Sequence, residues 1–257
     1  MKNQYFITVA GLLTLLFAGC ATKRSISDSG YREENTGRTH PAAVDPAFRY
    51  RGELSEFDLL GITHDQFTTE EQIRDALDAA KKVELHPSSS ILLIQSGAAI
   101  PDGAMTTSLS KHFAVVPFSG IPGGLGRVDE QNGSYERESF ARALRLAAAR
   151  GKNDIILCFW GTLESANQNL TTHTVSWVPV VGWMLPDKRE HMRILLKMAL
   201  IDVRTGNWTL FSPEPFQETR LSTTVNRETA DQKLVERLKS EAYSASAEEL
   251  VKRFCAR

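Results

Sequence analysis

Hydrophobic residues that recur every three or four positions predict the first helices of the chain. One helix is expected to begin after Phe67, where Thr68 and Glu71 have the spacing of a capping box, and to pack one face on a core. Its apolar stripe comprises Ile73, Leu77, Ala80 and Val83. A short helix is expected to follow over 101–111.

Two more helices are predicted farther along the chain. Ser134 is the expected N-cap of a helix that stops at Gly151. The stripe of this helix comprises Phe140, Leu144 and Ala148. A terminal helix is expected to start with a capping box at Thr229 and Gln232, and to break near Tyr243 because the same spacing recurs afterwards.

Short apolar runs between these helices predict strands. The runs are 91–94, 113–118 and 155–160, and the last is apolar on both faces, as expected of an interior strand. Residues 193–202 alternate between one dry and one mixed face. The Thr205-Gly206 turn then predicts an antiparallel return over 208–211, because glycine readily takes a positive φ.

This order of elements predicts an α/β fold: a mixed sheet with helices on its faces, a long C-terminal antiparallel hairpin and a terminal helix. Residues 51–257 are expected to form a single α/β domain. The 257 residues are 42% hydrophobic and 24% charged, as in ordinary globular proteins. With 30 basic and 31 acidic residues the formal net charge is −1, so no nucleic-acid partner is expected.

The N-terminus has the pattern of an exported protein. Lys2 precedes an apolar run over 5–17, which is too short to span a bilayer and has the length of the apolar part of a signal peptide. The run ends in Phe-Ala-Gly-Cys at Cys20, and here the chain resembles bacterial lipoproteins. The resemblance implies a signal peptide at 1–19 and a Cys20 that is lipidated and becomes the new N-terminus.

Localisation and domain position follow from the same region. By resemblance to enterobacterial lipoproteins, Ala21 in place of Asp implies an outer-membrane protein that faces the periplasm. Up to about residue 50 the chain is rich in Ser, Thr, Gly, Pro and charged residues, without a sustained apolar period. Residues 20–50 are therefore expected to form the lipidated cysteine and a flexible tether.

Two segments of the domain carry a second resemblance. They are the run from Asp154 to Leu163, with its Gly161-Thr162 pair, and the Asp-Val-Arg-Thr-Gly hairpin that ends at Gly206. In these the chain is similar to curli-type secretion lipoproteins, penicillin-binding-protein activator lipoproteins and the amino-terminal domain of the Tol–Pal translocation protein. The resemblance implies a protein that scaffolds, activates or secretes, and it implies no catalytic residue.

The chemistry-bearing residues do not form a complete motif. The six histidines are dispersed, the glycine-rich loops lack the spacing of phosphate loops, and no cysteine pair has metal-ligand spacing, so neither a metal nor a cofactor is expected. Cys158 is predicted to be a buried, inert thiol, and we expect no disulfide with Cys255. The alternative is a small envelope hydrolase that uses Ser119 or Asp202 with His191.

An apolar segment inserted before the hairpin is the candidate contact site. It has two tryptophans and no charge up to residue 186, and exposed apolar surface with tryptophan is typical of interaction sites. The candidate contact residues are Trp177, Val178, Pro179, Trp183, Met184 and Leu185. Core cover is the other interpretation. The expected function is a non-enzymatic lipoprotein that is held on the membrane by its lipid and binds an envelope protein or itself.

Overall fold

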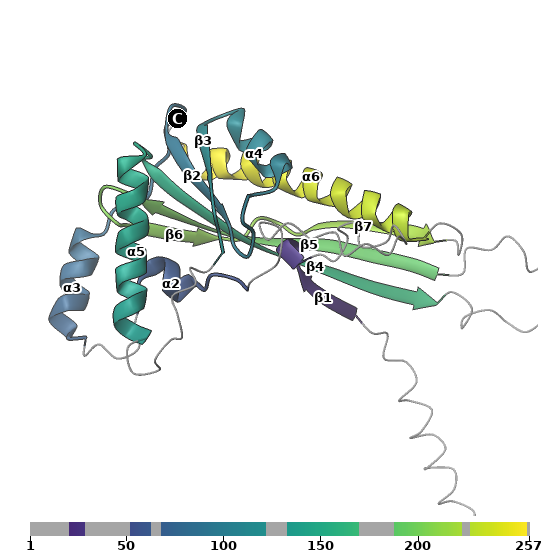
Figure 1. Cartoon of the computed structure of the whole chain (residues 1–257), viewed down its shortest axis with the longest axis horizontal. Helices are drawn as coiled ribbons and strands as arrows, with labels where there is room; N and C mark the ends of the chain where they lie inside the picture. The colour runs from purple at the N-terminus through teal and green to yellow at the C-terminus, as the bar shows by residue number, and fades with distance from the viewer. Residues whose placement is uncertain are drawn as a thin grey trace, which may run out of the picture.

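The computed structural model describes residues 21–28, 52–62, 68–121, 133–169, 188–222 and 227–255. In these ranges the chain folds as a seven-stranded mixed sheet with helices on its faces, which confirms the predicted fold class (Figure 1). The strands are β1 (Ala21–Ser25), β2 (Ser90–Gln95), β3 (Ala114–Phe118), β4 (Ile155–Asn169), β5 (Lys188–Asp202), β6 (Trp208–Phe211) and β7 (Phe216–Ser222). The helices are the 3-10 turn η2 (Ile26–Asp28), α2 (Glu56–Leu60), α3 (Glu70–Ala79), α4 (Gly103–Ser110), α5 (Gly133–Arg150) and α6 (Arg227–Phe254).

The long antiparallel pair β4 and β5 runs through the whole sheet and divides it into two halves. At one end β4 pairs with the parallel strand β2, β2 pairs with β3, and β5 pairs with β6. At the other end β4 pairs with β1 and β5 pairs with β7, both antiparallel. We call these the proximal half (β3, β2, β4, β5, β6) and the distal half (β1, β4, β5, β7).

The central strands of the proximal half, β2, β4 and β5, are buried on both faces, as expected of strands that are apolar on both sides. One face of the sheet contributes Leu93, Leu157 and Met198 to a core that it shares with α4 and α6. The other face contributes Ile94 and Cys158 to a second core, beneath α2 and α5. The interior-strand prediction for 155–160 is therefore confirmed.

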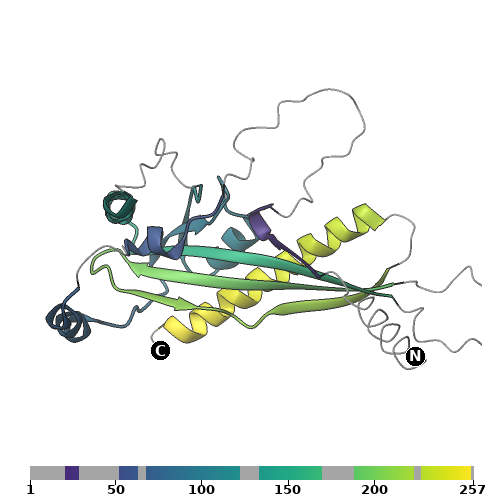
Figure 2. The same cartoon turned by 90° about the horizontal axis from the view of Figure 1, so that it is seen from below.

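The distal half is covered by a described helix on one face only. Leu163, Met192 and Ile194 point toward α6 and join its core. The cross-strand neighbours Glu164 and Arg193 lie on the opposite face. Figure 2 shows α6 crossing the long strands, and β4, β5 and β7 running together to the distal end of the sheet.

Edge strand β3 shows how a proline is accommodated in the sheet. The backbone N–H of Ala114 donates to the carbonyl of Ser89, so alternate residues of β3 turn their nitrogens toward β2. The nitrogen of Pro117 therefore faces the free edge, where a missing donor costs no ladder hydrogen bond. The predicted strand and the tolerated position of its proline are confirmed.

The N-terminal segment differs from the prediction. The sequence predicts a flexible tether over residues 20–50, yet Ala21–Ser25 form β1, and Ile26–Asp28 continue as η2. β1 pairs with β4 from Ala21 opposite Ala166 to Ser25 opposite Thr162. Local composition does not reveal this pairing because the partner strand lies far away in the sequence. The rest of the predicted tether lies outside the described residues.

Helix α3 also differs. Its N-cap is Thr69, in a capping box with Gln72, one residue after the predicted pair. The helix buries none of its residues: Ile73 is 44% exposed and Leu77 is 70% exposed. The prediction that the stripe of α3 packs against the core is therefore wrong. Val83 is buried, but it lies beyond the end of the helix.

Two helix boundaries need correction. Helix α5 already includes Gly133, so Ser134 lies within the helix rather than at its N-cap, while the end before Gly151 is as expected. Helix α6 begins at Arg227 and continues to Phe254 without the predicted break near Tyr243. Tyr243 is fully buried and anchors the middle of this helix.

Candidate functional site

The residues predicted to carry function lie mostly outside the described ranges. Cys20 immediately precedes β1 in the sequence. The candidate contact residues Trp177, Val178, Pro179, Trp183, Met184 and Leu185 lie in the chain between β4 and β5. They are therefore attached to the end of the distal half, the same end at which β1 begins.

The structure does not assemble the predicted hydrolase set. His191 and Asp202 belong to one strand, β5, and their eleven-residue separation corresponds to roughly 36 Å at ~3.3 Å per residue. The Asp202 carboxylate accepts hydrogen bonds from the backbone N–H and the hydroxyl of Thr205, at 2.6 and 2.9 Å, and so closes the hairpin turn. Ser119 follows β3, an edge strand that β2 and β4 separate from β5.

The two described cysteines, Cys158 and Cys255, differ in how deeply their thiols are buried. Cys158 is completely buried between the sheet and α5, and burial, with a smaller contribution from Glu53, raises the pKa of its thiol. Cys255 is half-buried, and desolvation raises the pKa of its thiol too. Both cysteines are free. The predicted burial of Cys158 is confirmed, and the raised pKa of its thiol agrees with the low reactivity that the sequence predicts.

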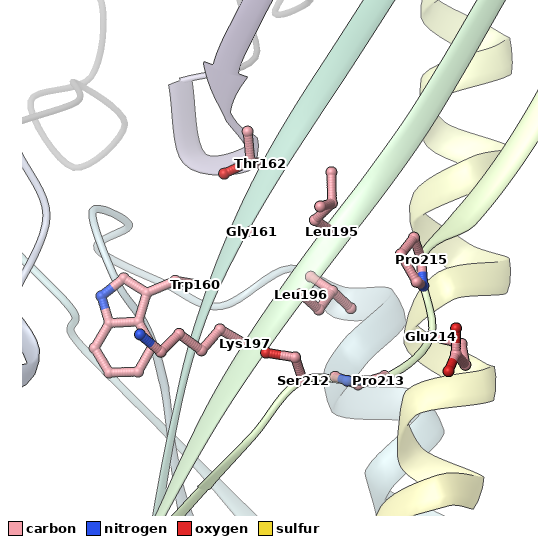
Figure 3. A pocket seen from close by; sticks show the side chains of 10 residues that line it. All are labelled: Trp160, Gly161, Thr162, Leu195, Leu196, Lys197, Ser212, Pro213, Glu214 and Pro215. Carbon is pink, nitrogen blue, oxygen red and sulfur yellow. The ribbon is translucent and has the colours of Figure 1, made fainter.

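A shallow pocket of about 390 Å³ opens where β6 and β7 leave a gap on β5 (Figure 3). Neither strand pairs with Leu195, Leu196 or Lys197 along this edge, and the connection 212–215, with its two prolines, passes beside them. The Lys197 ammonium pairs with Glu56, and the Trp160 indole N–H donates to the Leu54 carbonyl at 2.6 Å. Since these polar groups already have partners, we assign no ligand to the pocket.

A charged cluster lies on the face of the distal half that is turned away from α6. The Glu164 side chain is only 11% exposed and accepts from the Lys23 ammonium at 2.7 Å and from the Arg193 guanidinium. These two hydrogen bonds hold the pKa of Glu164 below its ordinary value. The three groups stand in one cross-strand row, which Gln217 of β7 continues.

The segment that follows Cys20 is bound to the domain by its own contacts. Ile26 is 1% exposed and packs on Gly161, where an added Cβ would lie 2.4 Å from the Ile26 Cδ1. The Ser27 hydroxyl donates to the Ser96 carbonyl at 2.7 Å, and the Lys239 ammonium donates to the Ile26 carbonyl at 2.8 Å.

A network of polar side chains around Asp102 adjoins these contacts. The Asp102 carboxylate accepts from the Tyr243 hydroxyl at 2.6 Å and from the Lys239 ammonium at 3.1 Å. Burial and the Asp102 charge raise the pKa of Tyr243, so this phenol stays protonated and donates. The Gln95 side chain joins the network to the N-terminal segment, because its amide donates to Ser27 while its carbonyl accepts from the Asp102 backbone N–H.

The described residues contain neither a membrane-spanning helix nor a metal-binding cluster. No helix in these ranges is both long and apolar enough to cross a membrane. Among the same residues, no group of three or more His, Cys, Asp or Glu side chains is arranged to hold a metal ion.

Comparison with protein families identifies the class to which this α/β domain belongs, that of bacterial lipoproteins. The matching model, the YafT bacterial lipoprotein, spans residues 55–253, so the chain belongs to that family. Membership fits a lipid-anchored protein of the bacterial cell envelope. The resemblance to curli-type, activator and Tol–Pal proteins stays a prediction, and no curated protein matches the chain.

Two solved structures are similar in part. A dodecamer of a PelC variant from Paraburkholderia phytofirmans is 11% identical, with a TM-score of 0.27 over 64% of this chain and 93% of that one. Lipoprotein GNA1162 from Neisseria meningitidis is 15% identical, with a TM-score of 0.23 over 60% and 99%. Both TM-scores are low, so neither likeness carries an argument about this chain.

Sequence reasoning missed the charged cluster and the fixed N-terminal segment. Both join β1 to strands more than 130 positions away, and only the register of the sheet brings them together. The sequence does show the apolar stripe of α3, but its periodicity predicts burial in the core rather than an exposed face.

Proposed function

We propose that the protein is a lipoprotein of the outer membrane, anchored through Cys20, whose periplasmic domain binds another envelope protein and performs no catalysis. The observation that supports binding is the unburied apolar face of α3, where Ile73 and Leu77 are exposed. An amphipathic helix ordinarily buries its apolar stripe, so a helix that leaves its stripe in water is typical of a contact surface.

The net charge of helix α3 indicates the chemistry of the partner. Four acidic side chains and one basic side chain lie on α3, which gives the helix a formal charge of −3. They are Glu70, Glu71, Asp75, Asp78 and Arg74. The expected partner surface is therefore an apolar groove with a basic rim, because complementary charge at the rim favours encounter and correct orientation.

Photocrosslinking in cells tests this surface. A photoreactive residue in place of Leu77 is expected to capture one defined envelope protein, whereas the same residue in place of Asp75 is not. Asp75 is the matched control because it lies two positions away on the opposite side of the same helix. Equal capture from both positions, or none from either, would contradict binding through α3.

A substitution then separates binding from folding. Leu77→Asp is expected to abolish co-purification of the captured protein while the melting temperature stays within about 2 °C, since surface changes usually cost no more than ~0.5 kcal/mol. A captured protein that still co-purifies with Leu77→Asp would show that the crosslink reports proximity alone.

The segment between β4 and β5 is the second proposed contact. Trp177→Ala combined with Trp183→Ala is expected to abolish co-purification of the partner with the melting temperature nearly unchanged. If these tryptophans cover the core instead, the change lowers the stability by ~3–5 kcal/mol for each buried ring. Trp208→Ala is the control, because Trp208 is 48% exposed and lies at the opposite end of β5.

A further inference from the structure

The position of β1 fixes where the membrane anchor meets the fold. β1 begins at Ala21, directly after Cys20, and its first residue is already paired with Ala166 of β4. No tether residue therefore stands between the proposed lipid attachment and the sheet. Figure 1 shows β1 entering the sheet beside the far ends of β4 and β5.

The contacts of η2 hold this connection in place. Ile26 is buried against Gly161, and its carbonyl accepts from Lys239 of α6. Ser25 donates to Glu53, and Ser27 donates to the Ser96 carbonyl. The strand pairing and three side-chain hydrogen bonds thus hold the segment against the domain. A lipid on Cys20 would therefore be attached directly to the distal half.

The hairpin of β4 and β5 extends beyond the level of Ala21, the first residue of β1. β4 continues for three residues past Ala166, and β5 starts three residues before its partner His191. At ~3.3 Å per residue this overhang is roughly 10 Å. A headgroup layer is only about 5–8 Å deep on each side of a bilayer, so a sheet standing upright would push the overhang into hydrocarbon.

The overhang is too polar for hydrocarbon. Its six residues, 167–169 and 188–190, are Asn, Gln, Asn, Lys, Arg and Glu. Burial of charged groups without partners is unfavourable, so the strands have to incline until these residues stay at headgroup level. One face of the distal half packs against α6, so the opposite face is the one that can approach the lipid.

That end of the sheet is basic, although the whole chain is slightly acidic. The positions 21–25, 164–169, 188–193 and 217–222 hold six Lys or Arg and three Glu, a formal charge of +3 against −1 for the chain. Lys23 and Arg193 are well exposed, with 70% and 50% of their side chains accessible. Positive charge beside a lipid anchor matches the phosphates of anionic phospholipids.

We propose that the open face of the distal half lies against the anionic phospholipid surface that holds the anchor, with Lys23 and Arg193 at the headgroup phosphates. The inference rests on the lipidation of Cys20 in the proposed function. It places α3 and α5 at the end of the domain that points away from the membrane, where Figure 1 shows them opposite β1.

Lipid quenching of a site-specific fluorophore tests the orientation. The full-length acylated protein with Cys255→Ser is placed in vesicles of phosphatidylethanolamine and phosphatidylglycerol that contain a headgroup spin label. A fluorophore at Gln217→Cys, on the row of Arg193, is expected to be quenched at least twofold more than one at Arg204→Cys, in the turn at the other end of β5. Equal quenching at both positions would overturn the proposal.

Flotation of the same samples distinguishes a failure of the proposed lipidation from a failure of the proposed orientation. Protein that does not float with the vesicles lacks the anchor, which overturns the lipidation and the orientation together. Protein that floats but shows equal quenching overturns the orientation alone. Because no other protein is present, a contact with a protein partner cannot produce the expected difference.

A release variant tests the role of the N-terminal segment. Ile26→Ser is expected to free β1 and to reduce the difference in quenching by at least half while flotation is retained. Ile73→Ser is the matched control, because this isoleucine is 44% exposed on α3, and the difference is expected to stay. If Ile26→Ser leaves the difference in quenching unchanged, the N-terminal segment does not set the orientation, and that part of the proposal is overturned.

Discussion

Gly161 makes it possible for the N-terminal segment to lie flat on the sheet. An added Cβ at this position would lie 2.4 Å from the Ile26 Cδ1 and 2.8 Å from the Leu196 Cδ2. The absence of a side chain in β4 thus creates the space that Ile26 fills. The sequence shows Gly161 inside a strand pattern, but the residue that approaches it lies 135 positions earlier.

Gly161→Ala is expected to lower the free energy of unfolding by about 1–3 kcal/mol, because overpacking at a buried contact forces side chains out of their preferred rotamers. Urea denaturation of the domain measures the change. Gly103→Ala is the control, since an added Cβ there meets no atom within 4 Å. An equal effect of both substitutions would show that the contact with Ile26 is not the cause.

Glu164 gives the distal half a dependence on pH. Lys23 and Arg193 donate to the ionised carboxylate and lower its folded-state pKa below the ordinary 4.5. The folded state therefore favours the charged form, so the stabilisation is complete above the ordinary pKa and is lost as the pH falls through the lowered one.

Glu164→Gln is expected to cost about 0.5–1 kcal/mol at pH 7, a value limited by the exposure of both basic partners. The difference from the unsubstituted protein should shrink as the pH falls below 4.5, and urea denaturation at several pH values measures it. Glu248→Gln, on the exposed side of α6, is expected to show neither effect. A difference that grows on acidification would contradict the role assigned to the carboxylate.

At the scale of elements, the sequence identifies the helices and strands better than it identifies their neighbours. The apolar runs locate β2, β3 and β4 because buried strands need side chains that are apolar on both faces. The stripe of α3 identifies an amphipathic helix correctly, but periodicity does not tell whether the surface it meets belongs to the same chain. β1 has no apolar run at all, so only its pairing defines it.

Helix α6 shows why local signals also misplace boundaries. Ser246 and Glu249 have capping-box spacing, yet Ser246 is buried inside a continuous helix. The burial of Tyr243 and its hydrogen bond to Asp102 hold the helix together at the predicted break. Tertiary contacts of this kind outweigh the preference of one serine for a cap.

Tyr243→Phe is expected to lower the free energy of unfolding by about 1–2 kcal/mol, because Asp102 loses one of its two described donors while the ring stays packed. Combined with Asp102→Asn, the loss is expected to be smaller than the sum of the single losses, as measured in a double-mutant cycle by thermal denaturation. Strict additivity would mean that the hydroxyl and the carboxylate do not interact in solution.

At the scale of the whole molecule, the two ends of the sheet serve different tasks. The distal half carries the anchor, the charged row and the attachment points of the segment with Trp177 and Trp183. The proximal half, whose central strands are buried on both faces, carries α3 and α5 at the far end of the domain (Figure 1). The candidate site was predictable from the sequence only as isolated features. Their arrangement at opposite ends depends on the long pairing of β4 and β5.

This division of tasks depends on Cys20. Its thiol is the proposed acylation point, so Cys20→Ser is expected to leave the protein outside the membrane fraction or as an unprocessed precursor. Metabolic labelling with a palmitate analogue should mark the unsubstituted protein and Cys255→Ser equally, and should not mark Cys20→Ser. A Cys20→Ser protein that still takes up the label would refute acylation at this residue. The same result would also remove the reason to place the distal half on the membrane, since that placement depends on a lipid at Cys20, directly before the first residue of β1.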